Sequence, residues 1–315
     1  MGSVDPVVLF FVLGVAAGLL RSDVRLPSAL YESLSIVLLI AIGLKGGVEL
    51  AKTALGEIAL PALAVVLMGL GTPLVAYPVL TRLGRFRRPD AASIAAHYGS
   101  VSVVTFAVGA AHLTRLGVPF EGYMTVFLVL LEMPALVAGV LLAKGIHRAT
   151  DWRALAHEIL CGKSIFLLAG GLAIGWLLGP EGIRPIDRLY FDLFKGILTL
   201  FLLEMGLITA ARLQDLKRAG AFLIAFGIAM PLVSAVGGAV TGWWLGLSVG
   251  GTTLLATLYA SASYIAAPAA MRIAVPEANP ALSIGASLGV TFPFNIVLGI
   301  PIYHAMAKAV HGLGG

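Results

Sequence analysis

Two short hydroxyl-rich segments share one pattern and lie about half the chain apart. The first reads Tyr98-Gly99-Ser100-Val101-Ser102, and the second reads Tyr259-Ala260-Ser261-Ala262-Ser263. Small, hydroxylated and β-branched residues weaken a helix locally, and Pro268 after the second segment cannot donate a backbone hydrogen bond. If both helices break here, each half-helix exposes free N–H groups and a positive dipole end. Two such ends that face each other predict an anion site without lysine or arginine. Ordinary tight packing of serines is the alternative.

A lone carboxylate, Glu132, lies within the apolar stretch Leu131-Glu132-Met133-Pro134-Ala135. An ionised side chain at a bilayer centre costs about 2.5–3.5 kcal/mol or more, so it needs a partner. A cation, a proton or a polar backbone group would serve, and a purely structural hydrogen bond is the alternative. The matching region of the second half offers oxygens from Thr291 and Asn295, and hard cations such as sodium prefer oxygen ligands.

Two further polar residues are candidates of lower rank. Glu204 is the second acidic residue in an apolar stretch, and its first-half equivalent is Ala41, which favours a structural role or a subunit contact. His97 precedes the first serine segment and is interpreted as a packed neutral imidazole, with a proton relay as the alternative. A serine enzyme with Ser100 or Ser102 as nucleophile and His97 as base is also possible. The second copy has no histidine, which favours binding over catalysis and predicts that the protein is not an enzyme.

The elements that carry these residues recur at an offset of 157 to 163 residues. Gly43-Leu44 recurs as Gly206-Leu207, and Val118-Pro119 recurs as Val275-Pro276. Gly14-Val15-Ala16-Ala17-Gly18 recurs as Gly171-Leu172-Ala173-Ile174-Gly175. Each half is predicted to hold five membrane helices, an odd number, so the two copies face opposite ways. Inverted repeats of this kind are typical of secondary transporters, which bind substrate at the repeat interface.

The composition predicts an all-α membrane protein. Charged residues make up 12% of the 315 residues, against about 25% in a soluble domain, and 59% are hydrophobic. A spanning helix needs roughly 20 apolar residues. Ten spans are predicted, at about 6–20, 30–44, 58–81, 91–111, 122–143, 164–179, 190–210, 219–245, 247–271 and 281–307. The predicted units are a first repeat over 1–143, a cytoplasmic linker over 144–163 and a second repeat over 164–315.

The lysines and arginines indicate an orientation. With the N-terminus outside, 14 of the 21 lie on the cytoplasmic side and 7 lie outside, a bias that supports this topology. Both termini are then expected outside the cytoplasm. The basic cluster of Arg82, Arg85, Arg87 and Arg88 lies in a short loop between apolar spans. It is interpreted as a topology signal and not as a nucleic-acid site.

At these segments the chain resembles the sodium-dependent bicarbonate transporter family of cyanobacteria and other bacteria. The similarity covers essentially the whole chain and is closest at three stretches: Phe194 to Gly206, Glu132-Met133-Pro134-Ala135-Leu136-Val137, and Val275-Pro276-Glu277-Ala278-Asn279-Pro280. The resemblance implies discontinuous, crossed helices four and nine, a mobile core domain against a scaffold domain, a trimer, and elevator-type alternating access in the bacterial inner membrane. It also implies bicarbonate as substrate, sodium as coupling ion and a PII-like regulatory partner on the cytoplasmic side.

Site residues follow from the resemblance by position. The substrate site would comprise Gly99, Ser100, Ser102, Thr105, Ser261, Ala262 and Ser263. The cation region would be centred on Glu132, where cyanobacterial members carry aspartate, with Ser102, Tyr264, Thr291 and Asn295. The chain departs from the family pattern at Val103, where those members have glycine, and at Tyr264, where they have aspartate.

The departure at Tyr264 removes an acidic cation ligand and predicts no more than one high-affinity sodium site. A membrane potential of about 100 mV, negative inside, opposes the inward movement of a monovalent anion by roughly 2.3 kcal/mol. One sodium ion carried with each anion makes transport electrically neutral. Two other readings stay open. One is a sodium- or proton-coupled permease for a small organic acid, and the other is a passive channel.

Overall fold

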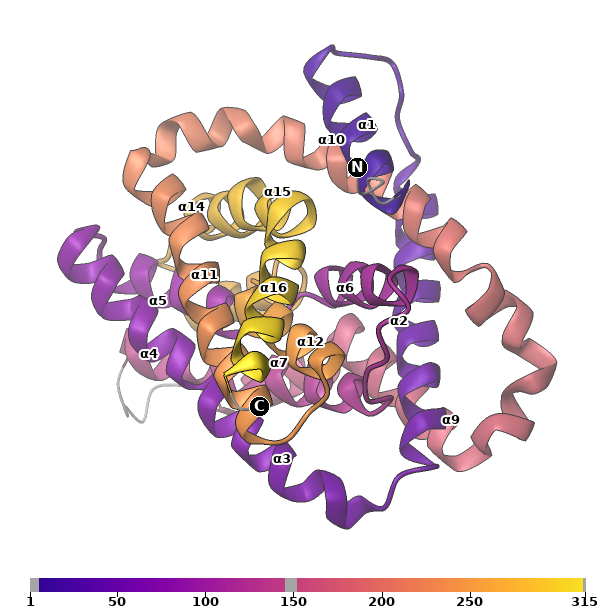
Figure 1. Cartoon of the computed structure of the whole chain (residues 1–315). Coiled ribbons are helices and arrows are strands. Elements are labelled where there is room, and N and C mark those ends of the chain that lie inside the picture. The colour runs from indigo at the N-terminus through magenta and orange to yellow at the C-terminus, as the bar shows by residue number, and fades with distance from the viewer. Residues whose placement is uncertain (1–5, 145–151, 314–315) are drawn as a thin grey trace.

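The described part of the chain is helical. The computed structural model describes residues 6–144 and 152–313, and these residues contain no strand (Figure 1). Eight helical segments in them are long and apolar enough to cross a membrane, which supports a multi-pass membrane protein. The other two predicted spans coincide with short apolar helices, α1 (Pro6–Leu19) and α12 (Val249–Ala260). A count of ten spans therefore stays a prediction.

The helices of the first half follow the predicted spans closely. In order they are α1, α2 (Ser28–Leu50), α3 (Leu55–Gly69), α4 (Gly71–Pro78), the π-helical turn η1 (Val79–Leu83), α5 (Arg88–Gly99), α6 (Val103–Arg115) and α7 (Met124–Lys144). Elements α3, α4 and η1 form one membrane-length segment over Gly56–Leu83.

The second half begins with a helix that the sequence did not predict. Within the expected linker, α8 (Trp152–Leu160) buries Leu155 and Ile159 in a cluster with residues of α13; residues 145–151 of that linker lie outside the described residues. The later elements are α9 (Lys163–Ile183), η2 (Arg184–Ile186), η3 (Arg188–Asp192), α10 (Phe194–Ala219), α11 (Ala221–Trp244), α12, α13 (Ala266–Ala274), α14 (Pro280–Ile284), η4 (Gly285–Thr291), α15 (Phe292–Phe294), η5 (Asn295–Gly299) and α16 (Ile300–Gly312).

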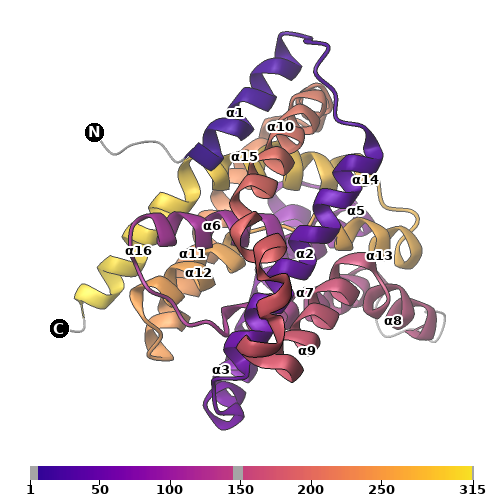
Figure 2. The same ribbon diagram turned by 90° about the vertical axis from the view of Figure 1, so that its right-hand side faces the viewer.

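Two helix pairs join the halves through glycines. Helix α1 packs along α10, and α2 packs along α9 (Figure 2). A Cβ at Gly14 would meet backbone atoms of Leu203 and Gly206, and a Cβ at Gly43 would meet backbone atoms of Leu168 and Gly171. Small residues let membrane helices approach at backbone distance. These two helix pairs, α1–α10 and α2–α9, are called the scaffold pairs below.

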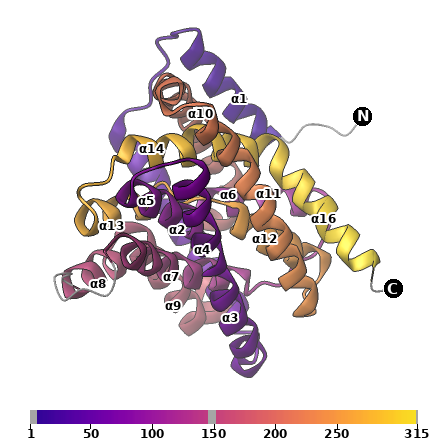
Figure 3. The same cartoon turned by 90° about the vertical axis from the view of Figure 1, so that its left-hand side faces the viewer.

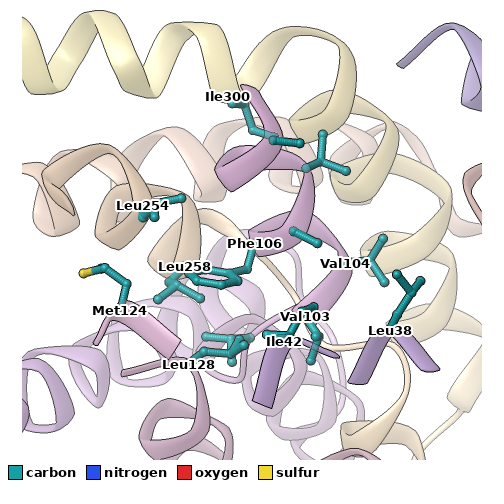
Figure 4. Close-up of a cluster of buried hydrophobic side chains, with 14 of the residues drawn as sticks. Leu38, Ile42, Val103, Val104, Phe106, Met124, Leu128, Leu254, Leu258 and Ile300 are labelled. Atoms are coloured by element: carbon teal, nitrogen blue, oxygen red, sulfur yellow. The ribbon is translucent and has the colours of Figure 1, made fainter. Parts of the chain in front are cut away.

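The remaining long helices pack beside the scaffold pairs. Helix α5 packs on α4 and α7, and α12 packs on α11 and α16 (Figure 3). A shared apolar core fills the space where α6 meets both groups, and Figure 4 shows Val103, Val104 and Phe106 of α6 in that cluster. Because α6 starts at the first serine segment, this core fixes the position of that segment.

Two polar anchors hold the ends of the broken helices. The carboxylate of Glu121 accepts hydrogen bonds from the Ser248 backbone N–H (2.6 Å) and hydroxyl (3.1 Å) ahead of α12. Asp90 near the start of α5 accepts the Asn279 N–H (2.8 Å), and the Asn279 side chain caps α14 through the N–H of Ala281 (3.0 Å). The second anchor explains why an asparagine stands before Pro280.

Candidate functional site

Both serine segments interrupt their helices, as predicted. Helix α5 ends at Gly99 and α6 begins at Val103, while α12 ends at Ala260 and α13 begins at Ala266. The two breaks contact each other through two hydrogen bonds. The N–H of Ser102 donates to Ser261 Oγ (2.9 Å), and the N–H of Ser263 donates to the carbonyl of His97 (2.8 Å). We call this interlocked region the crossing.

The crossing presents two helix N-termini. At α6, Ser102 Oγ caps the helix by accepting the N–H of Thr105 (3.2 Å) and also its hydroxyl (2.9 Å). At α13, Ser263 Oγ accepts the N–H of Ala267 (3.2 Å). The first N–H groups of a helix carry partial positive charge and have no intrahelical acceptor. The crossing therefore concentrates hydrogen-bond donors and positive potential in a buried place.

A buried carboxylate borders the crossing. Glu132 of α7 is 1% exposed, and its Oε2 has no hydrogen-bond partner among the described residues. Helix α7 is held against the first break because the Ser100 hydroxyl donates to the Glu132 carbonyl (3.3 Å) and a Cβ at Gly99 would meet Ala135. The Glu132 carboxyl group, whether ionised or protonated, therefore has an oxygen that lacks the hydrogen-bond partner or cation that a buried polar atom normally has.

A small cavity of about 10 Å³ separates Glu132 from the serines. Roughly 10–15 Å³ is the space that one water molecule needs, so a single small ion or water fits and a polyatomic anion does not. Eight residues line the cavity: Val101, Ser102, Val103, Glu132, Ser164, Ser263, Tyr264 and Ile265. Four of the predicted site residues thus lie together here: Ser102, Glu132, Ser263 and Tyr264.

Ser164 is a lining residue that sequence reasoning missed. Its hydroxyl is buried and has no hydrogen-bond partner among the described residues. The predicted sixth span starts at this residue, so the sequence places it at the membrane edge with no repeat partner. Only the fold of α9 against α7 brings it to Glu132.

Two predicted cation ligands do not line this cavity. The Thr291 hydroxyl donates to the Gly227 carbonyl (2.7 Å) and pairs with the Tyr98 hydroxyl (2.7 Å). The Asn295 amide donates to the Ala260 carbonyl (3.0 Å) and accepts the Tyr303 hydroxyl (2.6 Å). Their oxygens serve helix packing, although the Asn295 bond does satisfy the last carbonyl of α12.

The other predicted site residues near the crossing make structural contacts. Ser100 and Ser261 are buried and hydrogen-bonded to backbone carbonyls, at Glu132 and Leu258. Ala262 packs into an apolar cluster with Tyr98. Tyr264 packs edge-on against Phe292, with ring centroids 5.2 Å apart, so an aromatic edge stands where the resemblance leads one to expect a carboxylate.

Asn295→Ala separates the structural role of Asn295 from the predicted ligand role. The change leaves the Ala260 carbonyl and the Tyr303 hydroxyl unpaired, so we expect the free energy of unfolding to fall by about 1–3 kcal/mol. Sodium should stabilise the variant as much as it stabilises the wild type. Thermal unfolding of the purified protein across a sodium series measures both quantities. A tenfold loss of sodium affinity without a loss of stability would instead make Asn295 a ligand.

The His97 ring does not activate either serine. Its Nδ1 lies 2.7 Å from the Ser93 carbonyl, and its Nε2 has no hydrogen-bond partner among the described residues. Neither ring nitrogen hydrogen-bonds to Ser100 or Ser102, whereas a Ser–His nucleophile requires that bond. The described geometry therefore contains no Ser–His pair at the crossing.

Comparison with known families gives a match over most of the chain. The chain matches the sequence profile of the Na⁺-dependent bicarbonate transporter superfamily over residues 6–308. The protein therefore belongs to the Na⁺-dependent bicarbonate transporter superfamily, a family of membrane transporters. No protein with a curated description matches the chain.

Proposed function

We propose that the protein is a secondary active transporter that moves bicarbonate together with sodium, and that both ions bind at the crossing. The observation that carries this proposal is the interlock of two broken helices beside a buried, unpartnered carboxylate. The Glu132 cavity suits the cation alone, since about 10 Å³ has no room for a polyatomic anion. The helix N-termini suit the anion, and the crossing must open further than in this structure to admit it. Membership of the superfamily supports the same two ions.

The sodium site is proposed in the cavity around Glu132. The cavity has room for one small ion, and Glu132, Ser102, Ser164 and Ser263 are among its lining residues. Its accessible surface is apolar in this structure, so the oxygens of these side chains must turn toward the ion when it binds. Oxygen donors of this kind suit a hard cation. Because a tyrosine stands at position 264 in place of a second carboxylate, the site holds a single negative charge, that of Glu132. One sodium ion neutralises it, which agrees with one sodium ion per transported anion.

Coupling follows from the proximity of the two sites. An anion about 4 Å from an ionised carboxylate is repelled by about 4 kcal/mol at an effective dielectric constant of 20. Sodium on Glu132 removes this repulsion and adds attraction. The anion therefore binds well only after the cation, and the cation is held more tightly once the anion is present.

The contacts within the scaffold pairs support an arrangement of two inverted repeats. Gly14 and Gly171 match in sequence, as do Gly43 and Gly206, and the backbone contacts join Gly14 to Gly206 and Gly43 to Gly171. This exchange of partners is what a twofold axis between two repeats produces.

The contact between α2 and α6 suits sliding. Leu38 and Ile42 of α2 lie beside Val103 and Val104 of α6 (Figure 4). No hydrogen bond joins these two helices among the described residues. Apolar side-chain contact lets the crossing move past the scaffold without breaking polar bonds. The trimer, the PII-like partner, the bacterial inner membrane and the outside position of both termini stay predictions.

A small organic acid is a second candidate substrate because an apolar cavity lies next to the crossing. It is lined by Val103, Val104 and Ile265 together with Leu38 and Phe201. Valine in place of the family's glycine thus gives this side of the crossing an apolar wall. The cavity measures about 10 Å³, so it takes no more than a methyl-sized end of a small organic acid.

Uptake of labelled bicarbonate into proteoliposomes tests the proposal. We expect saturable uptake that requires an inward sodium gradient and does not occur with potassium. Acetate and pyruvate, added in excess, should not compete. Sodium-dependent uptake of an organic acid in place of bicarbonate would favour the second candidate. Equal uptake with and without the gradient would contradict coupled transport altogether.

Ser263→Ala tests the α13 side of the crossing. The change removes the cap of Ala267 and one cavity oxygen, so we expect the bicarbonate KM to rise about three- to tenfold, in keeping with 0.5–1.5 kcal/mol for one hydrogen bond. Ser287→Ala is the matched control, because the Ser287 hydroxyl is equally buried but donates only to carbonyls of the preceding turn, at Ser283 (2.8 Å) and Ile284 (3.4 Å). An unchanged KM in Ser263→Ala would place the anion elsewhere.

A further inference from the structure

A second polar cavity lies on another side of α5 and α13. It has a volume of about 80 Å³ and shares no lining residue with the Glu132 cavity. Helices α5, α13 and α14 meet there, as Figures 2 and 3 both show. Its polar lining comes from Ser93, His97, Arg272 and Ser283. The volume exceeds that of one water several-fold, so a small polyatomic ion fits.

His97 lines this cavity, and its ring carries a buried hydrogen-bond acceptor without a partner among the described residues. The side chain is 1% exposed, and its Nδ1 lies 2.7 Å from the Ser93 carbonyl. A carbonyl oxygen only accepts, so Nδ1 must carry the proton, and Nε2 of the neutral ring then holds a lone pair. Nε2 is buried without a partner among the described residues. A buried acceptor of this kind calls for a donor from a ligand or a water.

Arg272 contributes a positive charge that no acidic side chain neutralises. It lies in the last turn of α13 and lines the same cavity. None of the carboxylates in the described residues comes within 4.0 Å of its guanidinium. The nearby Asp90 is engaged by Arg87 (2.8 Å) and by the Asn279 N–H. A guanidinium offers paired N–H donors that match the two oxygens of a planar oxyanion.

We propose that this cavity binds a small oxyanion that carries an O–H group, with its charged oxygens on Arg272 and its O–H donating to Nε2 of His97. Bicarbonate and singly or doubly protonated phosphate share this chemistry. Nitrate and formate have the charge and the planar shape but no O–H donor. The neutral His97 lone pair discriminates against them because it would face an oxygen or a C–H in place of a donor.

The position of the cavity links it to transport. The His97 carbonyl accepts the Ser263 N–H (2.8 Å), so the residue that lines this cavity also forms one of the two bonds of the crossing. As far as bicarbonate is concerned, the inference rests on the proposed function. It assigns bicarbonate a second position beside the crossing, on the side that bears Arg272. Unlike the position next to Glu132, this one needs no sodium, because its positive charge is built in.

Binding of labelled bicarbonate to the purified full-length protein, with and without sodium, tests the inference. In sodium-free potassium buffer we expect the wild type to bind bicarbonate, and His97→Phe and Arg272→Gln each to weaken this binding about tenfold or more. Arg82→Gln is the control for surface charge, since Arg82 is an exposed arginine outside the cavity. Glu132→Gln should keep the sodium-independent binding while it loses the sodium-dependent part. Size-exclusion profiles show whether His97→Phe still folds. If it does not, Arg272→Gln still tests the site, because Arg272 is exposed and its replacement is not expected to disturb folding.

Competition identifies the ligand. Excess nitrate or formate should leave the sodium-independent binding in place. If phosphate bound without sodium and bicarbonate did not, the site would still be one for an oxyanion with an O–H group. Bicarbonate would then be ruled out as its occupant. Absence of sodium-independent binding of both anions, an unaffected Arg272→Gln, or full competition by nitrate would each overturn the site. Because Glu132→Gln reports on the crossing separately, failure of this site and failure of the proposed transport remain distinguishable.

Discussion

Glu132→Gln is expected to abolish sodium-dependent uptake while the protein still assembles. Glutamine keeps the size of the side chain and one oxygen, but it removes the charge that would hold the cation. Loss of a charged ligand costs about 1.5–3 kcal/mol, which corresponds to a roughly 10- to 100-fold fall in sodium affinity. Uptake of labelled bicarbonate at a fixed sodium gradient measures the effect, and the elution profile of the detergent-solubilised protein measures assembly.

Glu204→Gln is the matched control for this prediction. Glu204 lies within the apolar helix α10, and its Oε2 also lacks a hydrogen-bond partner among the described residues. It does not line the cavity at the crossing. We therefore expect sodium dependence close to that of the wild type. Wild-type uptake in Glu132→Gln, or an equal loss in both variants, would remove the reason to place sodium at Glu132.

Gly206→Ala is expected to destabilise the protein strongly, although it adds a single methyl group. The new Cβ would meet the Phe11 carbonyl and the Val15 N–H of α1, which are backbone atoms and cannot rotate away. Overpacking in a close contact costs about 1–3 kcal/mol. We expect a smaller fraction of folded protein after heating in detergent, measured by fluorescence-detected size exclusion.

The control for this change lies in the same helix. A Cβ at Gly196 of α10 meets no atom within 4 Å. Because alanine favours helix over glycine by about 1 kcal/mol, Gly196→Ala should be neutral or stabilising. If Gly206→Ala resisted heating as well as Gly196→Ala does, the close contact of α1 with α10 would not hold in solution.

The broken helices were predictable because the same signal occurs twice. The pattern of tyrosine, small residue and alternating serines marks both breaks, and the helices end at Gly99 and Ala260 inside it. The recurring glycines indicated the repeat but not which helices pack together, since Gly14 matches Gly171 in sequence but packs on Gly206. A sequence repeat shows which positions of the two halves are equivalent, but only the packed structure shows which helices are neighbours.

The composition of the cation region was less predictable. Thr291 and Asn295 have suitable oxygens, but each is committed to a bond with a distant residue, at Gly227 and at Ala260. Ser164 lacks any sequence signal and reaches Glu132 only through the fold of α9. Helix α8 is not predicted because its nine residues lie in the linker between two apolar spans. Side-chain partners depend on long-range packing, which periodicity and composition do not encode.

Reciprocal binding of the two ions tests shared occupancy of the crossing most directly. Sodium affinity is measured on the purified protein with and without bicarbonate, and bicarbonate affinity with and without sodium, both in the Arg272→Gln background to silence the second cavity. Each ion should tighten the other by the same factor, of about tenfold or more, because linkage requires equal coupling in both directions. Sodium affinity that does not respond to bicarbonate would contradict a common site between the interrupted helices and Glu132.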